Sequence, residues 1–333
     1  MMNVCVLGAG AWGTALAKVL ADKGNPTKVW ALHEEIASAI NDTHENKRYL
    51  PGHQLPATLS STHHLDQALA GADLVLVVVP THAIREVMGK AKGLIPEKAL
   101  LCSASKGIEN ESLMLMSGVL VDVLGKAYEP RLTYLSGPSF AKEVALGMPT
   151  AVVVAGTNAD NTKAVQVAFA SDKLRVYSSD DVVGVEIGGA MKNVIAIAAG
   201  AIDGLGFGHN SRAGMITRGL FEIGMLANKL GGHPLTVAGL SGMGDLVLTC
   251  TGDLSRNRTV GVELGKGRKL PDILAGLGHV AEGVKTAKSA YDLSIREDVL
   301  MPITHEVYKV LYEGKEARQA VVDIMTRELR SER

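Results

Sequence analysis

A glycine-rich turn near the start of the chain constrains its fold more than any other feature. Residues 8–13 read GAGAWG, follow a strand-like run at residues 3–7 and precede a helical pattern at residues 14–21. Glycines permit a tight turn and let backbone N–H groups approach a pyrophosphate, whose charge is stabilised by the N-terminus of the next helix. A G-x-G-x-x-G spacing alone is weak evidence, but the strand and helix around it favour a dinucleotide-binding turn.

The first half of the chain alternates short apolar runs with helical patterns, which is typical of a parallel sheet built from βαβ units. Several runs are nearly unbroken Val, Leu and Ile, as in strands covered by helices on both faces. The predicted strands are residues 3–7, 27–32, 74–79, 99–103, 132–135, 151–155 and 174–177. We therefore predict a Rossmann-type, doubly wound α/β domain over residues 1–180.

Strand patterns stop after about residue 179, and helical periodicity takes over. The predicted helices include residues 181–205, 210–230, 283–297 and 304–312. A chain of 333 residues is also long for one hydrophobic core. We predict a second, all-α domain over residues 181–333 that carries substrate-binding and catalytic groups.

Composition argues against two classes of function. The 34 Lys and Arg nearly cancel the 35 Asp and Glu, so no overall field attracts nucleic acid or an anionic membrane. The longest wholly apolar stretch, residues 194–202, is about half of what a membrane-spanning helix needs, and no secretory signal is evident. The three cysteines lack CxxC spacing and are interpreted as buried thiols in a reducing compartment. We expect a cytoplasmic protein without a bound metal.

In open α/β sheets, ligands bind outside the carboxyl ends of the strands. Lys106 follows one predicted strand, and Gly137 and Ser139 follow the next. A solvated lysine and a simple turn are the alternatives. After the second strand, His33 occupies the position where Asp or Glu would bind the adenosine ribose. Histidine tolerates a 2′-phosphate better than a carboxylate does, so the sequence slightly favours NADP over NAD, unless Glu34 binds the ribose.

In the helical half, Lys192 and Asn193 interrupt a strongly apolar helix. Helical spacing places small residues on the face of Lys192, namely Gly188, Gly189, Ala196 and Ala199. A lysine on such a face points into open space or against a closely packed partner. Burial and a second cation, Lys106, would suit it to proton transfer. The alternative is a lysine that extends to solvent at a helix crossing.

Two further polar groups follow downstream. Asp245 is predicted at a helix start with Thr249 on the same face, and an N-cap is the simpler interpretation of this aspartate. Ser255-Arg256-Asn257 then offers a guanidinium fork with polar neighbours, which suits a phosphate ester. An exposed basic turn is the alternative.

Together these segments resemble the NAD(P)-dependent glycerol-3-phosphate dehydrogenases of the bacterial biosynthetic type. The motifs that carry the resemblance are GAGAWGTA at Gly8, SASKGI at Ser103, LSGPSFA at Leu135, GGAMKN at Gly188, LSGMGDLVLTCTG at Leu240 and SRNR at Ser255. They occur in the family's order and span essentially the whole chain. The resemblance implies interconversion of sn-glycerol 3-phosphate and dihydroxyacetone phosphate with NAD(P), a supply of glycerol 3-phosphate for phospholipid synthesis, and a homodimer.

The resemblance also implies a role for each matching residue. Lys192 would accept the C2 hydroxyl proton during oxidation, with Lys106, Asp245 and Asn193 orienting the substrate oxygens. The implied substrate-binding residues are Lys106, Gly137, Ser139, Lys192, Asp245, Ser255, Arg256 and Asn257. The implied cofactor-binding residues are Gly8, Gly10, Ala11, Trp12, Gly13, His33, Lys106, Ala141, Arg256, Val280 and Glu282.

Two other functions stay open at the level of sequence. A β-hydroxyacid dehydrogenase of the 6-phosphogluconate or hydroxyisobutyrate kind would share the glycine turn and a lysine in the helical domain. A dinucleotide-sensing protein would keep the fold without catalysis, although the retention of Lys192, Asp245 and Arg256 argues against it.

Overall fold

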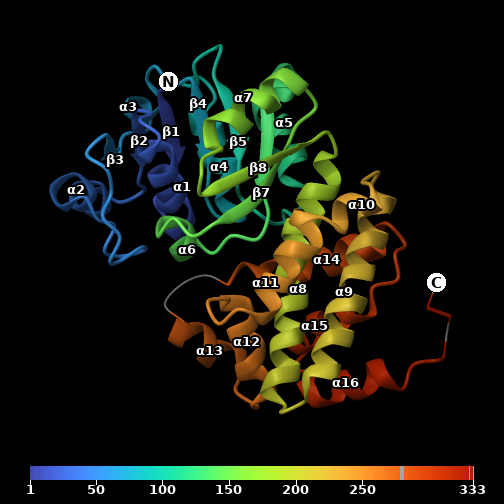
Figure 1. Ribbon diagram of the computed structural model, residues 1–333. Coiled ribbons are helices and arrows are strands. Elements are labelled where there is room, and N and C mark those ends of the chain that lie inside the picture. Colours follow the sequence, from blue (N-terminus) through green and yellow to red (C-terminus); the bar gives the residue numbers. More distant parts are fainter. Residues whose placement is uncertain (278–280, 330, 333) are drawn as a thin grey trace. The chain divides into compact units, whose positions relative to one another are not determined.

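The computed structural model describes residues 1–277, 281–329 and 331–332, and the chain divides into two compact units (Figure 1). The dinucleotide unit comprises Met1–Lys106 and Met114–Glu186, and the helical unit comprises Gly107–Leu113 and Ile187–Arg333. Residues 107–113 thus belong to the second unit, which the linear pattern gave no reason to expect. The predicted domain boundary near residue 180 stays a prediction.

An eight-stranded sheet forms the centre of the dinucleotide unit (Figure 1), in the order β3-β2-β1-β4-β5-β6-β7-β8. Its strands are β1 (Val4–Leu7), β2 (Thr27–Trp30), β3 (Leu59–Thr62), β4 (Leu74–Val77), β5 (Leu100–Ser103), β6 (Leu132–Ser136), β7 (Thr150–Ala155) and β8 (Leu174–Ser179). All neighbouring pairs are parallel except β6 and β7. The predicted Rossmann-type fold is confirmed, with a mixed sheet in place of a wholly parallel one.

Two features of the sheet escaped prediction. β3 has the sequence LSST and lies at the sheet edge, so it lacks the apolar run of a central strand. The connection from β6 to β7 contains only the short helix α6 (Ala141–Ala145), whose Val144 and Ala145 pack on Ala15. This connection has no full-length crossover helix of the kind that usually joins parallel strands, and it returns the chain antiparallel.

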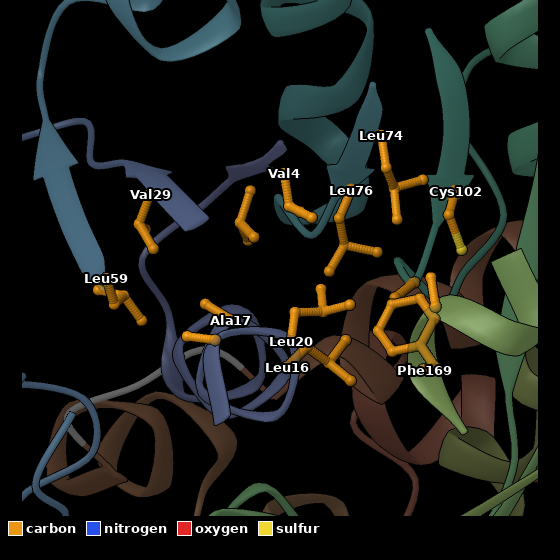
Figure 2. Close-up of a cluster of buried hydrophobic side chains, with 14 of the residues drawn as sticks. Val4, Leu16, Ala17, Leu20, Val29, Leu59, Leu74, Leu76, Cys102 and Phe169 are labelled. Carbon is orange, nitrogen blue, oxygen red and sulfur yellow. The ribbon is translucent and has the colours of Figure 1, made fainter. Parts of the chain in front are cut away.

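Helices cover both faces of the sheet, and each face has its own apolar core. On one face, shown in Figure 2, Leu16 and Leu20 of α1 (Ala11–Asp22) and Phe169 of α7 (Ala159–Phe169) pack on Leu74 and Leu76. On the other face, α4 (Ile84–Ala91) and α5 (Met116–Leu124) pack on β5 and β6. The remaining helices of this unit are α2 (Glu34–Thr43) and α3 (Leu65–Leu69), with 3-10 turns η1 (Thr81–Ala83) and η2 (Lys126–Arg131).

The helical unit is built around α8 (Val182–Gly204), which is apolar on most of its surface. By length and composition α8 could cross a membrane, but 78% of its most apolar window is buried inside the protein, as in a core helix. The other elements are α9 (His209–Lys229), α10 (Pro234–Val237), η3 (Leu240–Gly244), α11 (Asp245–Thr251), α12 (Arg256–Gly265), α13 (Leu270–Leu277), α14 (Glu282–Arg296), α15 (Pro302–Tyr312) and α16 (Ala317–Met325). The four helices predicted here match α8, α9, α14 and α15.

Glycines set the contact between α8 and α12. A Cβ atom built on Gly200 would lie 2.1 Å from the carbonyl oxygen of Arg258, and one on Gly261 would lie 2.0 Å from that of Ile197. Because the clash in both cases is with backbone, no side-chain movement could relieve it. We refer to this contact, made by Gly200, Gly204, Gly261 and Gly265, as the glycine seam.

Candidate active site

The glycine turn has the geometry that a dinucleotide requires. Gly8 has φ +120°, and a Cβ on Gly13 would lie 2.0 Å from the Gly8 carbonyl oxygen, so both positions need glycine for the turn itself. Gly10, the residue that caps α1, differs, since a Cβ there would meet no atom within 4 Å. The space beside Gly10 therefore lies at a helix N-terminus and suits a phosphate group.

Asn46 supports this turn and was not found from the sequence. Its Nδ2 donates to the Ala9 carbonyl oxygen and to Thr14 Oγ1, both at 2.8 Å, and the residue is buried. No spacing pattern indicates this residue, because it lies 37 positions from Ala9 and joins the turn only in the folded chain.

The other predicted cofactor residues of this unit fall into two groups. Ala11, Trp12 and Ala141 pack around the same small apolar cluster beside α1, and Trp12 Nε1 is buried without a hydrogen-bond partner among the described residues. His33 is exposed at the start of α2. An arginine that the sequence did not single out, Arg48, lies 3.6 Å from the Glu35 carboxylate in the first turn of that helix.

Lys106 and two predicted substrate residues meet where β5 and β6 end. Lys106 Nζ donates to the Gly137 carbonyl oxygen at 3.2 Å, and Ser139 Oγ donates to the same oxygen at 2.9 Å. Gly137 has φ +134°, and a Cβ there would lie 2.9 Å from Val152 Cα. The structure thus brings Lys106, which follows β5, together with Gly137 and Ser139, which both follow β6. Because Lys192 belongs to the other unit, its expected proximity to Lys106 stays a prediction.

In the helical unit, Lys192 forms an ion pair with Asp245. Lys192 Nζ lies 2.6 Å from Asp245 Oδ1, and the side chains are 12% and 1% exposed. Thr249 Oγ1 donates to the Asp245 carbonyl oxygen at 2.6 Å and lies 3.4 Å from Oδ1. The N-cap interpretation of Asp245 is wrong, because Gly244 precedes the helix and the carboxylate binds the lysine. The solvent-extended alternative for Lys192 is wrong for the same reason.

The small face predicted on α8 explains how the pair forms. A Cβ on Gly188 would lie 2.7 Å from the Ser241 carbonyl oxygen and 2.9 Å from Gly242 Cα. The backbone of η3 therefore rests directly on α8 one turn before Lys192. This contact starts α11 at the point where its first residue, Asp245, reaches the lysine.

A buried amide pair joins α8 to the start of α12. Asn257 Nδ2 donates to Asn193 Oδ1 at 2.8 Å, and Asn257 Oδ1 accepts the Gly283 N–H at 2.9 Å. Ser255 caps α12 through the Arg258 N–H. Through these hydrogen bonds, Asn193, Asn257 and Ser255 stabilise the helical unit, in addition to any contact with a ligand.

The remaining predicted residues lie near the ends of α12 and α14. Arg256 is the first residue of α12, is exposed, and forms no ion pair with any described residue. The neighbouring Arg258 instead binds Asp203, with Nη2 at 2.7 Å and Nε at 3.0 Å from Oδ2. Glu282 begins α14, and Val280 lies outside the described residues.

The three cysteines are buried. Burial raises the pKa of Cys5, Cys102 and Cys250 to about 12, and all three are free thiols. Within the described parts of the chain, no group of three or more His, Cys, Asp or Glu is placed to hold a metal ion.

The sheet topology and the glycine turn define a dinucleotide-binding protein of the Rossmann class. Family models for the N- and C-terminal parts of NAD-dependent glycerol-3-phosphate dehydrogenase match residues 3–162 and 181–322. The chain belongs to this family, as its motifs predict.

Individual relatives match this chain over nearly their whole length. A glycerol-3-phosphate dehydrogenase [NAD(P)+] of Myxococcus xanthus is 53% identical over 331 residues, which cover 99% of both chains. The crystal structure of glycerol-3-phosphate dehydrogenase from Coxiella burnetii is 38% identical, with a TM-score of 0.94 over 98% of this chain and 99% of that one. The corresponding yeast enzyme is 26% identical, with a TM-score of 0.84 over 98% and 99% of the two chains. The hydroxyacid dehydrogenase alternative is not favoured.

Proposed function

We propose that this protein reduces dihydroxyacetone phosphate to sn-glycerol 3-phosphate with NAD(P)H, and catalyses the reverse oxidation, with Lys192 as the group that exchanges the proton. The product would supply phospholipid synthesis. The observation that supports the role of Lys192 most directly is its ion pair with the buried Asp245. In this proposal the dinucleotide unit holds the cofactor, while the helical unit supplies the proton and binds the phosphate.

The ion pair suits Lys192 to act as an acid in the reducing direction. The Asp245 carboxylate is a counter-charge for the ammonium form and fixes the position of Nζ. As C2 of the substrate is reduced, negative charge develops on its oxygen, and an ammonium group at that oxygen stabilises the charge and then donates the proton. Oxidation reverses these steps, so Lys192 must first release its proton. The nicotinamide, when bound, supplies or accepts the hydride.

The residues of the dinucleotide unit would hold the cofactor and assist with the substrate. The open space beside Gly10 fits the pyrophosphate, and Trp12 and Ala141 would line the neighbouring surface. Lys106, held at the Gly137 carbonyl oxygen, would contact both the cofactor and a substrate oxygen. Because His33 replaces the usual carboxylate and Arg48 lies in the same region, we propose a preference for NADPH.

Arg256 is proposed as the phosphate anchor. Its guanidinium is exposed, whereas that of the neighbouring Arg258 is committed to Asp203. Arg256 also stands at the N-terminus of the ten-residue helix α12, where the helix dipole adds to its charge. A phosphate ester carries the opposite charge and fits the guanidinium fork.

One assay tests the activity and the cofactor preference together. The purified protein is mixed with dihydroxyacetone phosphate and either NADPH or NADH, and loss of reduced nicotinamide is followed at matched concentrations. We expect turnover with both cofactors and a higher kcat/KM with NADPH. Oxidation of a hydroxyacid such as 6-phosphogluconate, without any turnover of glycerol 3-phosphate, would reject the substrate assignment. Binding of NADPH without turnover of either substrate would favour a sensor.

We also propose a cytoplasmic homodimer. The buried free cysteines fit a reducing compartment, and Phe221 and Met225 expose apolar surface one turn apart on α9. Light scattering coupled to gel filtration should give twice the chain mass, 70 kDa for chains of 35.0 kDa. A mass of one chain at micromolar concentration would refute the dimer.

A further inference from the structure

Five buried side-chain polar atoms in the dinucleotide unit have no hydrogen-bond partner among the described residues. Besides Trp12 Nε1 and His44 Nδ1, they are Ser103 Oγ, Ser136 Oγ and Glu186 Oε2. Ser103 is 2% exposed and Ser136 is 5% exposed. Leaving a buried hydroxyl unpaired costs roughly 1–3 kcal/mol, so folded proteins nearly always satisfy such groups with protein atoms or with ordered water.

The two serines lie at the carboxyl ends of two neighbouring strands in the interior of the sheet. Ser103 is the last residue of β5 and Ser136 is the last residue of the adjacent β6. Ser103 is paired in register with Tyr134, and Ser136 lies two residues after Tyr134 on the same strand. Because side chains alternate along a strand and paired residues share a face, both serines point to the face that carries Tyr134.

Glu186 approaches the ends of these two strands from the helix layer. Its Oε1 accepts the Ser117 N–H at 2.9 Å in the first turn of α5. Since α5 runs from the end of β5 back to the start of β6, its N-terminus lies at the carboxyl ends of these strands. The pKa of Tyr134 is raised, first by burial and second by the negative charge of Glu186. This effect is expected if the Glu186 carboxylate lies on the face of the sheet that carries Tyr134.

We propose that Ser103, Ser136 and Glu186 enclose a buried water site that ties together the ends of β5 and β6. A water molecule can donate two hydrogen bonds and accept two, so one molecule can satisfy both hydroxyls and the free carboxylate oxygen. Burial raises the pKa of Glu186 to about 7, so at neutral pH its second oxygen can also carry a proton and donate.

The site has a consequence for the turns that follow the two strands. Ser105-Lys106 begins two residues after Ser103, and Gly137 directly follows Ser136. The water would therefore fix the spacing between Lys106 and the Gly137 carbonyl oxygen that its amine binds. In this respect the inference rests on the proposed function, because Lys106 and Gly137 are substrate-contact candidates there. Ser103 and Ser136 are positioning residues, not catalytic ones.

A crystal structure at high resolution and a double-mutant cycle test the site. The expected density is one ordered peak within about 3.2 Å of all three atoms. Unfolding of the dinucleotide unit can be followed by tryptophan fluorescence, because both tryptophans, Trp12 and Trp30, lie in that unit. We expect Ser103→Ala and Ser136→Ala each to lower Tm by about 3 °C. The double variant should lower it by little more than either alone, because losing one partner already releases the water.

Thr133→Val is the matched control, since this buried hydroxyl on the other face of β6 donates to the Leu101 carbonyl oxygen at 3.0 Å. It should lower Tm without coupling to either serine. The double serine variant should raise the KM for dihydroxyacetone phosphate several-fold with little change in kcat, and Thr133→Val should change neither. An empty density map, single variants with unchanged or raised Tm, or additive losses would overturn the proposal. The crystallographic and unfolding results stand even if the protein turns over no substrate, so the two proposals fail separately.

Discussion

Lys192 and Asp245 form an ion pair in which the carboxylate is almost wholly buried. We expect Lys192→Ala to lower kcat by about 10³-fold, as for loss of a general acid, with NADPH affinity nearly unchanged. The variant should also be less stable, by on the order of 3 kcal/mol, because the buried carboxylate loses its counter-charge. Steady-state kinetics and urea unfolding measure the two effects.

A double variant separates these effects. Asp245→Asn in the Lys192→Ala background removes the buried charge, so stability should recover while activity stays lost. An active Lys192→Ala protein would exclude this lysine from proton exchange, and recovery of both quantities would make its role structural.

Arg256 and Arg258 are neighbours with different surroundings, which provides a matched pair of variants. Arg256→Lys should raise the KM for dihydroxyacetone phosphate about tenfold, because a point charge replaces a two-donor fork, and should leave Tm unchanged. Arg258→Lys should lower Tm, since it disrupts the bonds to Asp203. Equal KM values for Arg256→Lys and the unmodified protein would move the phosphate site elsewhere.

Gly10 and Gly13 should respond differently to alanine. A Cβ at Gly13 would lie 2.0 Å from a carbonyl oxygen, so Gly13→Ala should destabilise the dinucleotide unit. A Cβ at Gly10 meets no protein atom, so Gly10→Ala should fold normally but bind NADPH at least tenfold more weakly, as expected when about 1.4 kcal/mol of contact is lost. Thermal unfolding measures the stability of both variants, and fluorescence titration measures their affinity for NADPH. Unchanged affinity of Gly10→Ala for NADPH would place the pyrophosphate elsewhere.

Glu222 gives the helical unit a pH-dependent stability. This buried carboxylate accepts the Ile303 and Thr304 N–H groups at the start of α15. Burial raises its pKa from 4.5 to about 7, against the opposing effect of those bonds. Between pH 4.5 and pH 7, the folded state therefore keeps a proton on Glu222 that the unfolded chain has already released. The contribution of this bound proton to the free energy of unfolding is complete below pH 4.5. It is lost as pH rises through 7, by up to about 1.4 kcal/mol per pH unit.

Comparison with Glu222→Gln isolates this titration. The stability of the unmodified protein relative to the variant should fall between pH 5 and pH 7.5. Circular dichroism is the suitable probe, because the tryptophans report only on the other unit. The exposed Glu313→Gln is the control and should show no such trend. A pH-independent difference between Glu222→Gln and the unmodified protein would refute the prediction.

The sequence predicted features that depend on local periodicity. Most strands, the helices around Lys192 and the glycine turn follow from apolar patterns and from residues that a turn demands. β3 escaped because an edge strand can be polar, and α12 was not among the predicted helices because its ten residues carry little apolar periodicity.

Contacts between distant segments could not be predicted in the same way. Asp245 was a sensible N-cap by spacing, and only the contact of Gly188 with η3 brings its carboxylate to Lys192. Asn46 and Glu222 are ordinary polar residues in the sequence, and their burial depends on segments 37 and 81 positions away.

The glycine seam fixes a length as well as a contact. Because backbone atoms of α8 and α12 touch, no change of rotamer can alter the separation between the helix that carries Lys192 and the helix that begins at Arg256. In the proposed function, Lys192 of α8 contacts the reacting carbon of a three-carbon substrate and Arg256 of α12 binds its phosphate. The glycine seam therefore sets the length of substrate that fits between these two residues. Side chains on the outer surfaces can diverge freely, whereas acceptance of a longer substrate would require these glycines to change first.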